Sequence, residues 1–470
     1  MPAIGTWSRE TGRIDGLQLA SRIAPGEVKR DEMPMRRQTI SERRRDVCAR
    51  RRRGKLLPAG RARVWRRAAS GLLAFLLTAH GPLRAETPAP ESAAAASDPE
   101  SIAIEAVYTG EVFGNTRGGL RRAARYLDNF DLMLTVPSEV FGYHGGTLFG
   151  YVLYNNKSTF SGPVVGDLQV VSNIDNEDNV RVFEAWYEQR FLAGRAGVKL
   201  GLFDLNAEFD AIETAGLFLL SSHGIGAEFS QTGLNGPSIF PITSAGARLD
   251  VRFGAPLLLR FAAFDAVPGT RNKPRKTAIH FSDGEGALLV LEADTHPLPD
   301  LRLVVGLWSY TSKFEAVESG FDDRAPQMRS GNNGIYVFAE GPLLTAHDDG
   351  SGRLDAWLRY GIADDHVNQL KRYIGSGLVY TGLLAQRPHD QLGLAVAVAE
   401  NGAPFLRAAE AAGMAEDKRE FNVELTYRAP INDWLAVQPD VQYIINPGTH
   451  PALRNALAIG LRFEIGFHLF

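Results

Sequence analysis

The C-terminal stretch "LAIGLRFEIGFHLF" (457–470) decides the fold, because an apolar side chain returns at every second position. One parity holds Leu457, Ile459, Leu461, Phe463, Ile465, Phe467 and Leu469, and the other holds Ala458, Gly460, Arg462, Glu464, Gly466 and His468. A period of two is typical of a β-strand whose faces meet different surroundings. A continuous apolar face opposite a small or charged one predicts lipid on one side and water on the other, although solvent-facing antiparallel sheets give the same pattern.

The charge of the chain is divided unevenly between its two ends. The 470 residues carry a net charge of −3, but residues 1–85 hold 20 Lys and Arg against 7 Asp and Glu, which leaves a net charge of −16 on 86–470. A basic run such as "RRQTISERRRDVCARRRRGK" (36–55) is also typical of an arm that binds nucleic acid. Here an apolar stretch (68–79) follows it, too short to span a bilayer, and "PLRA" (82–85) comes next. This layout predicts a basic leader with a secretory signal peptide over 1–85, cleaved near Ala85, and no nucleic-acid partner.

The remainder of the chain can cross a membrane only through strands. Residues 86–100, "ETPAPESAAAASDPE", have the composition of a disordered linker. The single cysteine, Cys48, lies in the predicted leader, so no disulfide or thiolate metal site is expected after cleavage. No apolar run approaching 18 residues follows the leader, and in lipid only helices and closed barrels satisfy the backbone.

Sixteen strand-like segments make up the predicted barrel domain, 129–470. They begin near Asn129, Gly146, Val164, Val180, Ala196, Ala245, Leu257, Glu285, Leu301, Gly334, Arg353, Gly375, Gln391, Arg419, Trp434 and Asn455. Connections after even-numbered segments are mostly short, whereas several after odd-numbered segments are long, as in outer-membrane barrels with short periplasmic turns and long outer loops. The fold class predicted is therefore all-β, a transmembrane antiparallel β-barrel of about sixteen strands. Residues 101–128 are expected to form an N-terminal periplasmic segment, which could fold as a helix.

The longest connection, roughly 205–244, is the third outer loop on this count. It contains "AIETAGLFLLSSHGIGAEF" (211–229), which is apolar enough to fold inward and pack. A loop of this length needs a role such as a lid or a constriction. We predict that it folds inward and narrows the pore.

The alternation also predicts which side chains line the lumen. An Arg facing lipid at mid-depth costs roughly 2–4 kcal/mol, so the polar parity of each strand must point inward. The candidate substrate-binding residues are Glu184, Trp186, Glu188, Arg190, Arg248, Asp250, Arg252, Asp355, Trp357, Arg359, Glu424, Asp440 and Gln442. Charges of both signs offer donors and acceptors to hydroxyls, and an indole face offers apolar contact to a sugar ring. Facing charges in any barrel can instead simply neutralise one another.

Several stretches resemble the carbohydrate-selective porins of bacterial outer membranes (the OprB type), over nearly all of 103–470. The most specific is "ELTYRAPINDWLAVQPDVQYIINPG" (424–448); "YTGEVFGNTRGGLRRAARYLDNFDLMLTV" (108–136) and "VKLGLFDLNAEFDAIETAGLFLLSSHGIG" (198–226) precede it in order. The resemblance implies a sixteen-stranded barrel in the outer membrane, passive diffusion of a monosaccharide such as glucose, and no enzyme activity or cofactor. It also implies arginines and acids at the narrowest point of the pore, at the matching positions of the fourth strand and of 236–252.

Three alternatives stay open at this point. A general non-specific porin would have the same barrel. An outer-membrane enzyme would need a nucleophile and a base, and Ser221, Ser222 and His223 are adjacent in sequence. A barrel plugged by 101–128 is the third.

"DNEDN" (175–179) and "DDGSG" (348–352) look like calcium loops but lack the twelve-residue ligand pattern, so turns are expected and no metal is predicted. The partners expected are small sugars and outer-membrane lipid, with the protein a homotrimer or a monomer.

Overall fold

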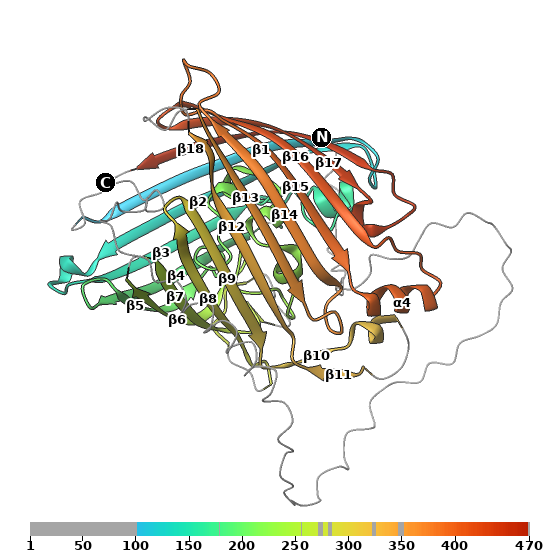
Figure 1. The fold of residues 1–470 in the computed structure, drawn as a ribbon, viewed down its shortest axis with the longest axis horizontal. Coiled ribbons are helices and arrows are strands. Elements are labelled where there is room, and N and C mark those ends of the chain that lie inside the picture. Colours follow the sequence, from blue (N-terminus) through green and yellow to red (C-terminus); the bar gives the residue numbers. More distant parts are fainter. Residues whose placement is uncertain are drawn as a thin grey trace, which may run out of the picture. The chain divides into compact units, whose positions relative to one another are not determined.

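Sixteen antiparallel strands form a closed barrel (Figure 1). The computed structural model describes residues 101–468 except 178, 255, 271–275, 281–283, 322–325 and 346–351. The barrel strands are β1 (Ala103–Arg117), β2 (Ala123–Pro137), β3 (Gly146–Asn155), β4 (Asn179–Phe191), β5 (Ala196–Phe203), β6 (Ser244–Phe253), β7 (Leu257–Asp265), β8 (Ala287–Leu298), β9 (Leu301–Tyr310), β12 (Asn333–Thr345), β13 (Arg353–Ala363), β14 (Leu370–Thr381), β15 (Gln391–Asn401), β16 (Arg419–Asn432), β17 (Leu435–Ile445) and β18 (Ala456–His468). The predicted fold class is confirmed.

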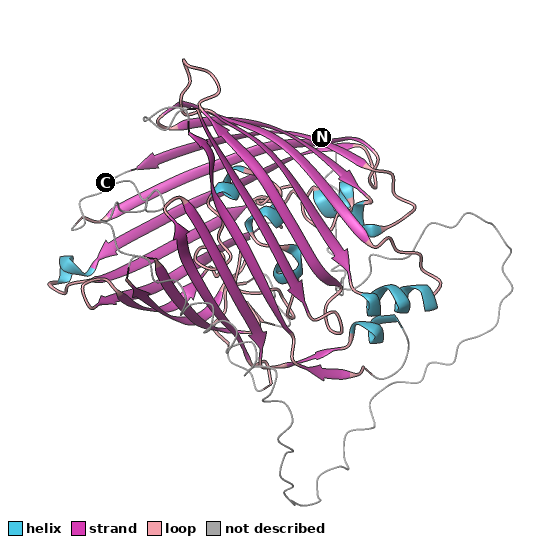
Figure 2. Cartoon of the chain, viewed as in Figure 1, coloured by secondary structure: helices cyan, strands magenta, loops and turns pink. Residues whose placement is uncertain are grey.

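Short helices and one small hairpin occupy the connections (Figure 2). They are η1 (Ser138–Phe141), η2 (Ser161–Val165), η3 (Thr214–Leu217), α2 (Ser221–Gly224), α3 (Ala227–Ser230), η4 (Val317–Phe321), α4 (Ala403–Ala411) and η5 (Pro447–Thr449), with the two-stranded sheet β10 (Lys313–Glu315) and β11 (Met328–Ser330). Among the residues described, no helix is long and apolar enough to cross a membrane.

The two faces of the strands differ in exposure as the alternation predicts. In β18, Ile459 and Leu461 are 45% and 49% exposed, whereas Ala458 and Arg462, on either side of this pair, are buried. The same contrast separates exposed Leu425 from buried Glu424 and Thr426 in β16. Because neighbouring side chains of a barrel strand point to opposite faces, the exposed apolar row is the outer surface and the buried polar row faces the interior.

The barrel closes through β1, which the sequence had placed outside it. β1 pairs with β2 on one side and with β18 on the other, from Glu105 opposite His468 to Arg117 opposite Leu457. The prediction of a separate periplasmic segment over 101–128 is therefore wrong. These residues supply β1 and the start of β2. Its outward positions include the small residues Ala106, Gly110 and Gly114, which give little apolar signal.

The segment predicted as a strand from Val164 is instead η2, a π-helical turn. Pro163 lacks a backbone N–H and follows Gly162, and Gly166 ends the turn in a left-handed conformation (φ 81°). The predicted total of sixteen is confirmed, but one spurious strand had replaced one that was missed. From β4 onward each predicted strand has the same place in the order of barrel strands as the observed one.

A bulge alters which side chains of β4 face inward. By alternation from Glu184 and Trp186, Phe183 would share the lipid side with Ala185 and Tyr187. The pairing of β3 with β4 shifts between Tyr151 and Val152, and Phe183 is only 4% exposed, with its ring 5.0 Å from that of Tyr151. Phe183 and Glu184 are consecutive buried residues, as expected where one extra residue is inserted in a strand.

Candidate lumen site

A charged cluster joins β4, β5 and β6 on the inner face. Glu188 pairs with Arg190 and contacts Arg248 (3.2 Å) and Lys199 (3.6 Å). Asp250 pairs with Arg190 at 2.8 Å and with Arg248 at 2.6 Å. These strands are adjacent in the sheet, and the alternation brings one charged residue from each to the same level. The structure thus brings together four of the predicted site residues: Glu188, Arg190, Arg248 and Asp250.

One member of this cluster comes from the β5–β6 connection and was not predicted. Glu208 pairs with both Lys199 and Arg248. Burial raises the pKa of Glu208, but Lys199 and Arg248 more than offset this, so the pKa lies below its ordinary value. Glu208 is therefore a carboxylate that ties the connection to the wall at neutral pH.

An aromatic surface adjoins the charges. The ring of Trp186 stacks on Phe149 with centroids 4.9 Å apart, and the Lys199 Nζ lies 3.7 Å from the Trp186 centroid. The Trp186 indole N–H donates to Glu184 at 2.9 Å. Trp186 is only partly buried, so the site combines an accessible indole with donors and acceptors of both signs.

A ladder of alternating charges continues onto β7, β8, β9 and β12 and was missed from the sequence. Arg260 lies 2.9 Å from Glu292 and 3.3 Å from Asp294, while Arg302 lies 3.1 Å from Asp294 and 2.7 Å from Glu340. The alternation of "VLEADTHP" (290–297) carried the signal for Glu292 and Asp294. Both arginines lie in strongly apolar segments, where a single charged residue does not reveal a polar row.

Arg359, a predicted pore-lining residue, is fully buried against the β5–β6 connection. Its Nε and Nη2 donate to Asp210 at 2.8 and 2.5 Å, and its Nη1 and Nη2 donate to Glu228 at 3.1 and 2.9 Å. Its side chain has no exposed surface. Arg359 therefore has no free donor to offer a solute in this conformation, and its role is to hold two loop carboxylates.

Glu424, Asp440 and Gln442 also contact loops. Glu424 accepts hydrogen bonds from the backbone N–H groups of Leu219 (2.6 Å) and Leu220 (3.1 Å). The Gln442 side-chain amide donates to Asp440 (3.0 Å) and to the carbonyl of Val171 in the β3–β4 connection (2.7 Å). All three are at most 1% exposed.

The remaining predicted residues lie apart from the cluster. Trp357 is 2% exposed, with its ring 5.2 Å from that of His223. Asp355 pairs with Arg353 at 2.7 Å on the same strand. Arg252 is exposed near the end of β6.

Glutamates on the inner face of the barrel strands, called wall glutamates here, bind the backbone of the β3–β4 and β5–β6 connections. No sequence motif predicts this pattern. Glu292 accepts from the N–H of Asp210, and Glu340 accepts from those of Glu213 and Thr214. Glu420 accepts from Leu168 and Gln169 of the β3–β4 connection. Because the donors are backbone groups, the position of the acceptors fixes the path of the loops whatever side chains the loops carry.

The adjacent serines and histidine do not form a catalytic dyad. The Ser222 hydroxyl donates to the Gln169 side chain at 3.2 Å, and the Nδ1 of His223 lies 3.3 Å from the Tyr373 hydroxyl. Burial lowers the pKa of His223 to about 3. Both side chains are sealed from solvent, His223 completely.

The motif "DNEDN" forms a turn, and one compact group of possible metal ligands occurs among the described residues. Asp175 of "DNEDN" accepts from the N–H groups of Phe160 and Ser161, as a turn residue does. Residues 348–351 of "DDGSG" lie outside the described residues. Asp364, Asp365 and His366 are close enough to share an ion, but Lys371 already pairs with Asp365 at 3.0 Å.

Comparison with known proteins identifies the family. The family described as carbohydrate-selective porin, OprB family, matches residues 121–467. Porin B of Pseudomonas aeruginosa is 25% identical over 401 residues, which cover 77% of this chain and 86% of that protein. The high-pH structure of Pseudomonas putida OprB superposes with a TM-score of 0.69 at 22% identity, covering 78% of this chain and 94% of that one. The chain belongs to the OprB family of carbohydrate-selective porins, which are outer-membrane channels and not enzymes.

Proposed function

We propose that this porin passes neutral monosaccharides such as glucose by passive diffusion, through a passage narrowed by the β5–β6 connection folded into the lumen. The observation that carries the proposal is the cluster on β4, β5 and β6, where Trp186 stays accessible beside paired charges of both signs. Paired charges offer donors and acceptors to hydroxyls without a strong net field, and the partly exposed indole of Trp186 adds apolar surface beside them.

Contacts with inward-facing wall residues support the inward path of the β5–β6 connection. Arg359 of β13, Glu340 of β12 and Glu424 of β16 all bind this connection. The Gln438 side chain of β17 donates to the carbonyl of Leu217 at 2.7 Å. A segment that bonds to the buried face of so many strands takes up space that an open barrel would leave to water.

The exposure of the charged residues indicates which wall borders the passage. Side chains bound to the connections, such as Arg359 and Glu424, are completely buried. Arg190 is 40% exposed, Arg260 17% and Arg302 14%. We therefore assign solute contact to Trp186, Glu188 and Arg190, with the buried charges Glu184, Arg248 and Asp250 holding them in place and the ladder of Arg260 and Arg302 as the continuation of this wall.

The apolar outer row predicts contact with outer-membrane lipid, and the assembly proposed is a homotrimer or a monomer. We also propose that residues 1–85 are a leader with a cleaved signal peptide and that 86–100 link it to the barrel. These residues lie outside the described part of the chain.

Liposome swelling tests the proposal. Vesicles with the purified protein are diluted into isotonic D-glucose, a neutral amino acid of similar size, or a disaccharide. We expect glucose to enter faster than the amino acid, and Arg190→Ala to slow glucose more than it changes salt conductance. Arg353→Ala is the matched control, since Arg353 has similar exposure (46%) but lies away from the cluster. Rates that depend on solute size alone would show a general porin instead.

A further inference from the structure

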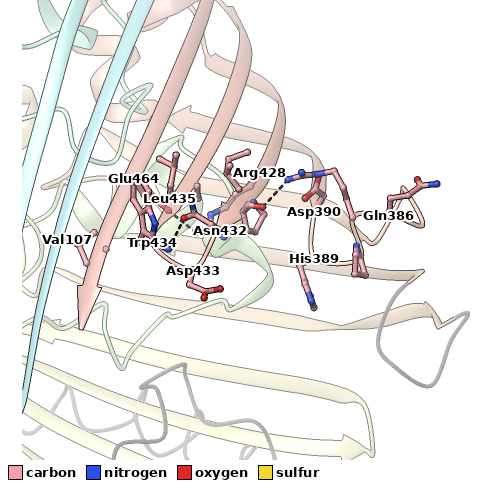
Figure 3. Close-up of a pocket in the computed structure, with 16 residues that line it drawn as sticks. Val107, Gln386, His389, Asp390, Arg428, Asn432, Asp433, Trp434, Leu435 and Glu464 are labelled. Atoms are coloured by element: carbon pink, nitrogen blue, oxygen red, sulfur yellow. Dashed lines mark hydrogen bonds and ion pairs between the residues drawn. The ribbon is translucent and has the colours of Figure 1, made fainter. Parts of the chain in front are cut away.

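A pocket of about 740 Å³ lies at the end of the barrel where short turns join the strands (Figure 3). It is lined by the β16–β17 turn, by residues 386–390 of the β14–β15 connection, and by residues near the start of β1 and the end of β18. Short turns are on the periplasmic side of outer-membrane barrels. Its volume falls in the range of small-molecule sites, roughly 300–1,000 Å³.

The polar rows of β16 and β18 end at the pocket. Arg428 continues the row of Glu424 and Thr426, which are buried, and Glu464 continues the row of buried Arg462. At the mouth this row becomes accessible, with 34% of the Arg428 side chain and 29% of the Glu464 side chain exposed. A solute that leaves or enters the passage on this side meets these groups.

Two ion pairs line the pocket, together with Asp433, which forms no ion pair among the described residues. Arg428 lies 2.8 Å from Glu464, and Arg387 lies 2.5 Å from Asp390. An ionic ligand would have to compete with these internal partners, whereas a hydroxyl can add to both members of a pair. The carboxylate of Asp433 disfavours an anion, and the paired charges offer donors and acceptors to the hydroxyls of a neutral ligand.

An indole completes this environment. Trp434, in the β16–β17 turn, lines the pocket and is 49% exposed. Asn432 adds an amide group beside Trp434, and Gln386 lies apart from them on the β14–β15 connection (Figure 3). An aromatic face beside planar polar side chains matches the alternating C–H and O–H surfaces of a pyranose.

We propose that this pocket is a second sugar site, which binds a neutral monosaccharide at the short-turn mouth of the channel, apart from the cluster on β4, β5 and β6. The inference rests on the proposed function for the class of sugar. It gives a permeating sugar a binding step at the mouth in addition to the step at the cluster.

Tryptophan fluorescence tests the site directly. In the described barrel, Trp308 and Trp357 are at most 2% exposed, so a response to added sugar must come from Trp186 or Trp434. Titrating the purified protein in detergent with D-glucose should give a saturable change with a component that Trp434→Phe removes and Trp186→Phe retains. A change that survives Trp434→Phe unaltered, or its absence in the native protein, would overturn the proposal.

Flux measurements give a second arm. Trp434→Ala should raise the glucose concentration for half-maximal flux about threefold to tenfold, the value of one aromatic contact, and leave salt conductance unchanged. Phe191→Ala is the matched control, an aromatic of similar exposure (50%) at the end of β4 that does not line the pocket. The double variant Arg428→Gln, Glu464→Gln keeps the net charge and should weaken binding as well; unchanged binding there would overturn the site.

The two proposals fail separately. If glucose has no advantage over the amino acid in swelling but the Trp434 response persists, only the assigned selectivity of the passage fails. If glucose is favoured and the Trp434 variants behave as the native protein, only the mouth site fails. Heat-modifiable mobility on gels confirms that each variant is folded before either result is counted.

Discussion

Arg359 shows most clearly what a single buried side chain does for this channel. Arg359→Ala leaves Asp210 and Glu228 buried without their cation, a loss expected to cost about 3–5 kcal/mol of unfolding free energy. The β5–β6 connection should loosen, so salt conductance rises together with sugar flux. Thermal unfolding in detergent and single-channel recording in planar bilayers measure the two effects.

The control for this change lies on the same strand. Arg353 pairs only with Asp355 and is 46% exposed, so Arg353→Ala should alter stability by less than about 0.5 kcal/mol and leave conductance unchanged. A folded Arg359→Ala protein with native conductance would contradict the role assigned to Arg359.

The sequence predicted which residues of the site face the interior of the barrel, but not which of them are exposed there. Alternation alone placed Arg190 and Arg359 on that face, and their exposures then differ completely, 40% against none. Parity says which face a residue takes but not what covers it, and the cover here is a connection whose path depends on contacts distant in sequence. Arg260 and Arg302 were missed because their neighbours are almost all apolar.

At the scale of elements, the wall glutamates should decide the position of the β5–β6 connection. Glu340 accepts from Thr214 N–H at 2.8 Å and pairs with Arg302 at 2.7 Å. Glu340→Ala removes both contacts, each worth about 1.5–3 kcal/mol, and should raise conductance and admit a disaccharide in swelling assays. Glu340→Gln keeps an acceptor oxygen for the backbone and should recover much of the native behaviour. Equal behaviour of the two variants would show that the backbone contact is not what holds the connection.

The start of the same connection should respond to pH. Burial, followed by repulsion from Glu184 and Glu208, raises the pKa of Asp204 to about 8 from an ordinary value of 3.8. The folded protein holds this proton in a range where the unfolded chain has lost it, so the contribution of Asp204 to stability falls as pH rises from 3.8 to about 8 and is constant above. The free energy of unfolding of the native protein should fall between pH 6 and pH 9, and that of Asp204→Asn should fall by less. An identical loss in both would exclude Asp204 as its source.

For the whole molecule, the sequence predicted the architecture better than the membership of the barrel. Long strands with clear apolar rows, such as β16 and β18, were found. The division into short and long connections held for most connections from β4 onward, but the β13–β14 connection (364–369) is shorter than the β14–β15 connection (382–390). β1 was missed because glycine and alanine occupy much of its outer row, and a segment with Pro163 was taken in its place. Closure is a property of the complete sheet, and no single strand's pattern states which strand must meet the last one.

The closing role of β1 gives the last prediction. If 101–128 were a plug, removing its first part would open the channel. Because β1 pairs along its length with β18, deleting 103–117 should instead leave two unpaired edges, which lipid does not tolerate. We expect no heat-modifiable folded form after refolding into detergent or lipid, and no conductance. Deleting 403–411, which removes α4 from a connection and keeps all sixteen strands, is the control and should leave a folded barrel. A folded, more conductive protein lacking 103–117 would return that segment to the role of a plug.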